Sequence, residues 1–108
     1  MELAKKKCAA CDGGMPILSE SEANRYLEQL RDWQINRGKF LSKTFIFKNF
    51  AESLALANRI AEIAEEQRHH PDLLVRWGEL GIKIWTHAVD GLTENDFILA
   101  AKIDELTG

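Results

Sequence analysis

Cysteine is scarce in this chain of 108 residues, which has only two, Cys8 and Cys11. A structural zinc site takes about four ligands, and the sequence offers no second cysteine pair. A thioredoxin-type redox motif follows a strand within a βαβ unit, and no such pattern surrounds Cys8. We therefore expect two reduced thiols near the N-terminus, and a zinc ion shared between subunits is the alternative.

Long hydrophobic runs and basic stretches are also missing. No apolar run reaches the ~18 residues of a membrane-spanning helix, and no apolar segment follows the basic N-terminus as it does in a secretory signal. The net charge is −3 and Lys5–Lys7 is a single short basic run, which disfavours nucleic-acid binding. These absences predict a cytoplasmic protein that binds neither membrane nor nucleic acid.

Residues that interrupt regular structure are concentrated near the N-terminus. Gly13, Gly14 and Pro16 predict a flexible arm over residues 1–18. The remaining residues, 19–108, have the size of one domain. Because 45% of the chain is hydrophobic, that domain is expected to have a single buried core.

Three helices and two hairpins are predicted for this domain. Capping-box patterns begin a first helix at Ser19 and a last helix at Thr93, and the longest helical periodicity runs from 50 to about 66. Alternating residues predict one hairpin around a turn at 36–39, and a second with strands 73–77 and 82–87 joined by a turn at 78–81. This order predicts an α+β fold with a four-stranded antiparallel sheet and all three helices on one face.

All three histidines of the chain lie around the second hairpin. His69 and His70 precede Pro71, which disfavours a helical backbone at His70, so the preceding helix should end before it. Strand alternation puts His87 on the face opposite the two isoleucines of its own strand. A hairpin brings its two ends together, so His70 and His87 are expected to be neighbours.

Histidines gathered on one surface suit general acid–base chemistry near neutral pH. Asp96 in the last helix and Glu65, one helical turn before His69, are candidates to orient the imidazoles. Other interpretations stay open at this point. Asp96 also fits an acid that stabilises a helix N-terminus, Glu65 fits a solvated charge, and the tryptophans of the hairpin fit ordinary strand residues. A zinc site with three histidine ligands is conceivable, although adjacent histidines tend to diverge.

At these positions the sequence resembles the pterin-4a-carbinolamine dehydratase family. The family pattern is an acid, His-His-Pro, an aromatic residue, a further histidine and an aspartate. Its spacing is kept here in Glu65, His69-His70-Pro71, Trp77, His87 and Asp96. The segment 91–96 is similar to the one that opens the family's last helix, and the resemblance covers about residues 17–106. One departure is Leu73, where mammalian-type members have a tryptophan.

The resemblance implies a hydro-lyase that converts a 4a-hydroxytetrahydropterin into a quinonoid dihydropterin and water. This reaction recycles the tetrahydrobiopterin-type cofactor of aromatic amino acid hydroxylases. The resemblance implies no metal or organic cofactor, and it implies a homodimer or homotetramer. It makes the three histidines catalytic and two acids supporting, with four further residues contacting the pterin: catalytic His69, His70 and His87; supporting Asp96 and Glu65; substrate-binding Pro71, Trp77, Thr86 and Ala88.

A non-catalytic role is the alternative that the resemblance leaves open. Some family members are dimerisation partners of a transcription factor, and degenerate relatives help to assemble the carbon-fixing carboxylase. The wide apolar face of the helix over 50–66 would carry such a role here. The complete histidine set favours the enzyme.

Overall fold

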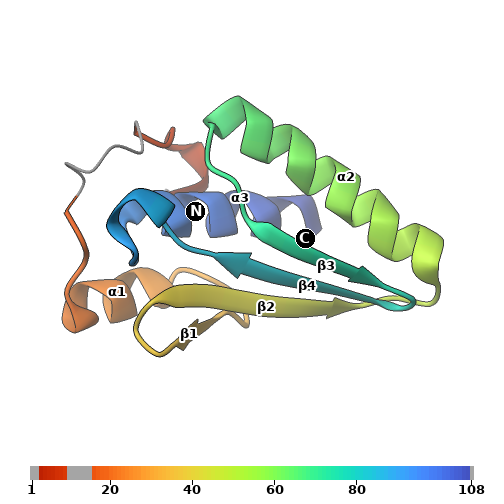
Figure 1. Ribbon diagram of the computed structural model, residues 1–108, viewed down its shortest axis with the longest axis horizontal. Helices are drawn as coiled ribbons and strands as arrows, with labels where there is room; N and C mark the ends of the chain where they lie inside the picture. The colour runs from red at the N-terminus through yellow and green to blue at the C-terminus, as the bar shows by residue number, and fades with distance from the viewer. Residues whose placement is uncertain (1–2, 10–15, 108) are drawn as a thin grey trace.

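The computed structural model describes residues 3–9 and 16–107, so Cys11, Gly13 and Gly14 lie outside the described residues. A four-stranded antiparallel sheet and three α-helices follow one another in the predicted α-β-β-α-β-β-α order (Figure 1). Short 3-10 turns are added near the N-terminus and after the last strand. The elements are η1 (Leu3–Lys5), α1 (Glu20–Leu27), β1 (Gln34–Asn36), β2 (Phe40–Ile46), α2 (Phe50–Gln67), β3 (Asp72–Arg76), β4 (Glu79–Ile84), η2 (His87–Val89) and α3 (Glu94–Thr107).

The sheet has the strand order β1-β2-β4-β3, which places the second hairpin beside the first through the β2–β4 pair. Leu41 pairs with Ile84 and Phe45 with Leu80, so the apolar positions of the two central strands lie on the same face. Figure 1 shows α2 and α3 on that side of the sheet. The predicted α+β architecture is confirmed.

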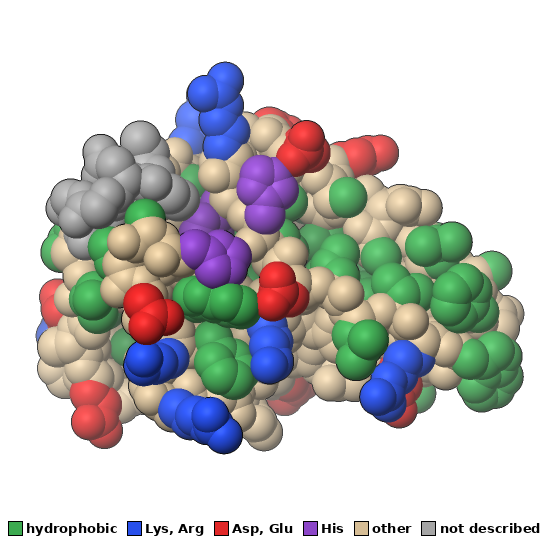
Figure 2. Space-filling model, viewed as in Figure 1, with side chains coloured by type: hydrophobic (Ala, Val, Ile, Leu, Met, Phe, Trp, Pro, Cys, Tyr) green, Lys and Arg blue, Asp and Glu red, His purple; other side chains and the backbone are tan. Residues whose placement is uncertain are grey.

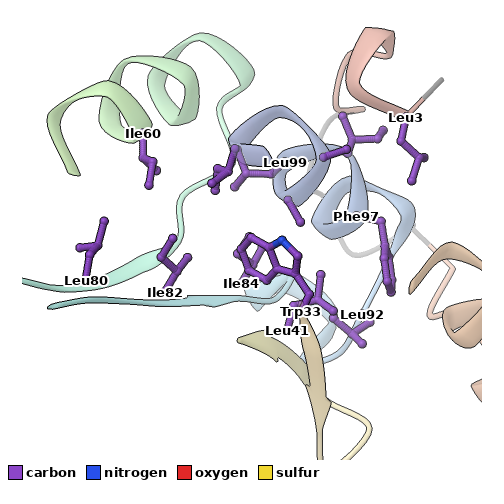
Figure 3. Close-up of a cluster of buried hydrophobic side chains, with 14 of the residues drawn as sticks. Leu3, Trp33, Leu41, Ile60, Leu80, Ile82, Ile84, Leu92, Phe97 and Leu99 are labelled. Carbon is purple, nitrogen blue, oxygen red and sulfur yellow. The ribbon is translucent and has the colours of Figure 1, made fainter. Parts of the chain in front are cut away.

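The core lies between this sheet face and the helices (Figure 3). Leu80, Ile82 and Ile84 of β4 are buried there, together with Ile60 of α2 and Leu99 of α3. The first helix joins the same core, because Tyr26 in α1 stacks on Phe97 in α3 with 5.3 Å between ring centroids. None of the helices in the described part of the chain is long and apolar enough to cross a membrane.

A tight turn joins α2 to β3 and sets the directions of two histidines. The backbone of Arg68 is left-handed, with φ of 54°, and the His69 amide donates to the Ala64 carbonyl at 3.1 Å. This pattern closes a helix C-terminus, where glycine is the usual residue. Pro71 follows and prevents a return to helix. Within this turn the His69 side chain is buried and the His70 side chain is exposed.

The second hairpin differs from the prediction at both ends of its returning strand. Strand pairing with β3 begins at Glu79, so the turn is shorter than the predicted 78–81. Leu80 is buried in the core and belongs to the strand. The strand ends at Ile84 and does not reach His87. Beyond it, Thr86 and Gly91 form an isolated antiparallel bridge that closes a loop, and His87 begins the 3-10 turn η2 inside that loop.

A buried ion pair lies under the sheet, and the sequence patterns did not predict it. Lys43 occupies a core-facing position of β2, and its Nζ lies 3.0 Å from Asp104 Oδ1 in α3. Their side chains are only 10% and 2% exposed. The indole nitrogen of Trp33 donates to the same carboxylate at 2.9 Å, and so does the backbone amide of Arg31 at 3.0 Å. Asp104 thus connects α3 to the loop before β1 and to β2.

The predicted division into an arm, 1–18, and a domain, 19–108, stays a prediction. What the structure adds is that residues 3–9 contact α3 and the end of α2. Composition gave no sign of these contacts.

Candidate active site

A hydrogen bond between His69 and Asp96 is the centre of the candidate site. His69 is 4% exposed and Asp96 is fully buried, and His69 Nε2 lies 2.6 Å from Asp96 Oδ1. An ionised carboxylate can only accept hydrogen bonds, so the ring proton of this pair belongs on Nε2 of His69. The carboxylate therefore selects one tautomer of the imidazole and fixes the plane of the ring.

The second oxygen of Asp96 is held as firmly as the first. Thr86 Oγ1 donates to Oδ2 at 2.9 Å and the backbone amide of Thr93 donates to it at 2.8 Å. The hydroxyl of Thr93 in turn lies 2.8 Å from that of Thr86. Asp96 also stands in the first turn of α3, where the helix dipole favours a negative charge. One carboxylate thus caps α3 and orients His69.

His70 points away from this buried pair, as the prediction of diverging histidines required. Its Nε2 contacts Glu65 Oε2 on the last turn of α2, and both side chains are more than half exposed. An exposed pair of this kind contributes little to stability. It does hold the imidazole of His70 next to the end of α2.

His87 approaches the same surface from η2 and is exposed. Its ring meets the ring of Trp85 edge to face, with 4.3 Å between centroids, and Trp85 lies 6.3 Å from the ring of Phe40. Figure 2 shows the histidine side chains gathered on one face, beside a hydrophobic patch with charges of both signs around it. A cavity of about 220 Å³ is lined by Lys39, Phe40, Lys83, Trp85 and Asp90, and Trp85 is the lining residue whose ring contacts His87.

The remaining predicted site residues differ in burial and in their distance from the histidines. Pro71 is half-buried next to His70, and Ala88 is exposed next to His87. Thr86 is fully buried, and its hydroxyl is directed to Asp96, so its side chain orients the carboxylate.

Trp77 is not brought to the histidines. It lies in the turn between β3 and β4 and is 73% exposed, and the length of β3, roughly 17 Å, separates it from His70. The aromatic ring that contacts His87 is that of Trp85, a residue that fits an ordinary strand position in the sequence. The available signal was its position two residues before His87 in the predicted strand, because alternate strand positions share a face, although both residues lie beyond the end of β4 at Ile84.

The zinc alternative for the histidines can be compared with this geometry. Within residues 3–9 and 16–107, no three side chains of His, Cys, Asp or Glu are arranged so that they could hold a metal ion. The carboxylates of Glu65 and Asp96 instead take one imidazole each. This arrangement suits proton transfer at two or more separate points of a bound molecule.

Comparisons with known proteins agree with the resemblance found in the sequence. A relative from Rubrobacter xylanophilus bears the name pterin-4-alpha-carbinolamine dehydratase. It is 48% identical to this chain, over 97% of this chain and 98% of the relative. A relative of the same name from Rickettsia canadensis is 50% identical over 94% of each chain.

Two solved structures are similar in fold. The transcriptional coactivator/pterin dehydratase from Brucella melitensis superposes with a TM-score of 0.81 at 31% identity, over 86% of this chain and all of that one. A pterin dehydratase-like protein identified as a RuBisCO assembly factor in the α-carboxysome has a TM-score of 0.60 at 23% identity, over 74% of this chain and 94% of that one. The second likeness concerns the fold alone. The family described as pterin 4 alpha carbinolamine dehydratase matches residues 16–106, and this chain belongs to that family.

Proposed function

We propose that this protein dehydrates a 4a-hydroxytetrahydropterin to a quinonoid dihydropterin and water, and so recycles a tetrahydrobiopterin-type cofactor in the cytoplasm. One observation carries the proposal: the buried hydrogen bond of 2.6 Å between His69 and Asp96, next to two exposed histidines, in a chain of this family. The non-catalytic alternative explains the cap that Asp96 provides for α3, but it gives the orientation of His69 no role. The enzyme would act on the product of an aromatic amino acid hydroxylase.

The reaction needs a proton donor and a proton acceptor at different atoms of the pterin. The bond between C4a and its hydroxyl oxygen breaks, and that oxygen leaves as water after taking a proton. The electron pair of the N5–H bond forms the new double bond as the N5 proton departs. The two proton transfers balance, so an imidazolium and a neutral imidazole, or an imidazolium and a water molecule, suffice.

We assign the acid–base pair to His69 and His87, and substrate contact to His70. His69 supports this assignment because its Nε2 proton is directed to Asp96, so Nδ1 is the nitrogen of a neutral ring that accepts a proton. His87 is exposed and oriented by Trp85. His70 is held by Glu65 at the rim, where an exposed imidazole can bond to a polar edge of the pterin.

The flat pterin ring also needs an apolar surface. We propose Trp85 and Phe40 for this contact, because both line the cavity and the ring of Trp85 contacts that of His87. Trp85 thereby takes the role that the family pattern suggested for Trp77. Pro71 and Ala88, adjacent in the chain to His70 and His87, are proposed to complete the pocket wall.

A coupled assay tests the function. An aromatic amino acid hydroxylase generates the 4a-hydroxypterin, and the loss of its ultraviolet absorbance is followed with and without the purified protein. Acceleration is expected in proportion to protein concentration. Equal rates with and without the protein would rule the function out.

Replacing His87 by alanine is expected to lower kcat by about 10²-fold, because general acid–base groups contribute about this much or more. His70→Ala is the matched comparison, since His70 is exposed as well. It should raise KM more than it lowers kcat if His70 only contacts the substrate. Steady-state kinetics of the two variants separate these effects, and a loss of kcat confined to His70→Ala would reverse the assignment.

We also propose that the chain forms a homodimer or homotetramer. Large hydrophobic side chains are exposed near the start of α2, on β2 and β3, and in the turn between β3 and β4: Ile46, Phe50, Leu54, Leu74 and Trp77. Exposed apolar residues in such a group are typical of interaction surfaces, and Figure 2 shows hydrophobic side chains at the end of the molecule away from the histidines.

Leu54→Glu is expected to shift the protein toward monomer, because a charge at the centre of an apolar interface is left without a partner. Light scattering after size exclusion measures the mass of the assembly. Glu62→Gln, at an exposed position on the same helix, is the control and should leave the mass unchanged. A monomeric wild-type protein would contradict the proposal.

A further inference from the structure

The N-terminal segment of residues 3–9 lies along α3 and reaches the end of α2 (Figure 1). Leu3 is 2% exposed and belongs to the hydrophobic core (Figure 3). The carbonyl of Ala4 accepts a hydrogen bond of 2.7 Å from Lys102 Nζ in α3. This segment is therefore attached to the domain at several points, and we call residues 3–9 the clamp.

The last residues of the clamp bind side chains that flank the His69–Asp96 pair. The backbone of Ala9 makes two hydrogen bonds of 2.8 Å with the side-chain amide of Asn95, one in each direction. The amide of Cys8 donates to Gln67 Oε1 at 2.9 Å. Asn95 directly precedes Asp96, and Gln67 stands two residues before His69.

The chemistry of Asn95 fits this contact closely. A carboxamide has a donor and an acceptor side by side, so it can pair with a peptide group in both directions at once. Asn95 is 1% exposed, and a buried amide that loses its partners is costly. The side chain thus holds Ala9 on the first turn of α3, while Gln67 holds Cys8 on the last turn of α2.

These two helix ends are the ones that must stay together for the site to keep its geometry. His69 follows the end of α2, and Asp96 lies in the first turn of α3, with 2.6 Å between Nε2 and Oδ1. The clamp is bonded to both ends through adjacent residues, Cys8 and Ala9. A movement of one end relative to the other would have to break at least one of these bonds.

We propose that the clamp fixes the distance between His69 and Asp96, and that Asn95 and Gln67 are positioning residues for proton transfer by His69. The catalytic part of this inference rests on the proposed dehydratase function, whereas its structural part does not.

Another contact of the clamp provides a control, because it does not involve the side chains of Asn95 or Gln67. Lys6 Nζ lies 2.7 Å from Glu94 Oε2; the Lys6 side chain is exposed and that of Glu94 is partly exposed. The hydrogen bond from Lys6 holds the pKa of the Glu94 carboxyl below its ordinary value, and Tyr26 Oη donates to the same oxygen at 3.0 Å. Lys6→Ala removes this ion pair and leaves the bonds of Ala9 and Cys8 in place.

The test compares Asn95→Leu with Lys6→Ala in the full chain by two measurements. The first is the proton NMR signal of His69 Nε2, whose exchange with water reports the bond to Asp96. In Asn95→Leu this exchange is expected to be at least tenfold faster, and kcat about 10- to 100-fold lower with KM changed less than twofold, since small misplacements of reacting groups have effects of this size. Lys6→Ala should match the wild type in both.

Unchanged His69 proton exchange in Asn95→Leu would overturn the clamp proposal. Should Asn95→Leu fail to fold, Gln67→Met at a half-buried position takes its place: faster exchange of the His69 proton supports the proposal, and unchanged exchange overturns it. If the wild type itself proves to have no dehydratase activity, the proposed function fails, and the NMR measurement still decides whether the clamp positions His69.

Discussion

Replacing Asp96 by asparagine is expected to lower kcat/KM by about 10²- to 10⁴-fold, with little change in the shape of the site. Thr93 donates its backbone N–H to Oδ2, so the amide oxygen of the new side chain must take the place of Oδ2. The amide NH₂ then faces His69 Nε2 and forces that nitrogen to accept. The imidazole proton moves to Nδ1, and the ring is held in the wrong tautomer, a change that costs about 10⁴-fold in a serine protease triad.

Glu65→Gln is the matched control, because it makes the same acid-to-amide change at the other histidine. Glu65 and His70 are exposed, so water can replace the lost acceptor, and less than a tenfold loss is expected. Ring ¹⁵N chemical shifts of His69 measure the tautomer directly. Wild-type kcat/KM in Asp96→Asn, or equal losses in the two variants, would show that the buried pair has no special role.

The largest expected effect on stability is that of Asp104→Ala. Removing this carboxylate leaves the Lys43 ammonium without its counter-charge beneath the sheet, and leaves the Trp33 indole N–H without its acceptor. Breaking a buried pair from one side typically costs about 3–5 kcal/mol in the free energy of unfolding. A domain of this size has a total of about 5–15 kcal/mol. Urea unfolding followed by tryptophan fluorescence measures the loss.

Two further variants show whether the buried charge is the cause. Arg76→Ala removes an exposed ion pair with Glu79, and should change the free energy of unfolding by less than about 1 kcal/mol. The double variant Lys43→Met with Asp104→Leu removes both charges and should recover the part of the loss that comes from the unpaired ammonium, because an apolar pair can replace a buried ion pair, whereas the Trp33 indole N–H still lacks its acceptor. A cost below about 1 kcal/mol for Asp104→Ala alone would mean that water reaches Lys43.

Local patterns were enough to predict the elements and part of the site. The capping box at Ser19 and the helical periodicity over 50–66 depend on neighbours a few residues apart, and both are present. The divergence of His69 and His70 also follows from local geometry. Pro71 disfavours a helical backbone at His70, so the two adjacent histidines lie in the turn after α2 and their side chains point in different directions. The structure agrees with the sequence-based predictions where the residues that determine a feature lie only a few positions apart in the chain.

The features that sequence patterns missed depend on distant partners. In the sequence Lys43 has the features of an ordinary polar strand residue. Its buried partner, Asp104, is 61 positions away and comes beside it only in the folded chain. Asn95 is 86 positions from Ala9, and no local pattern connects them. Trp77 fits the family spacing, yet it lies at the far end of its hairpin, because a strand carries position 77 away from the corner at Pro71. Tertiary pairing decides each of these cases.

The left-handed backbone at Arg68 has a consequence for substrate binding. The junction between α2 and β3 is four residues long, and two of them, Arg68 and Pro71, are restricted in their backbone angles. The directions of His69 and His70 are therefore settled when the chain folds. Ordering mobile side chains at the moment of binding opposes association, and in the proposed site this entropy loss is smaller because the backbone of the two adjacent histidines is already fixed. In the proposed reaction such preorganisation favours fast turnover.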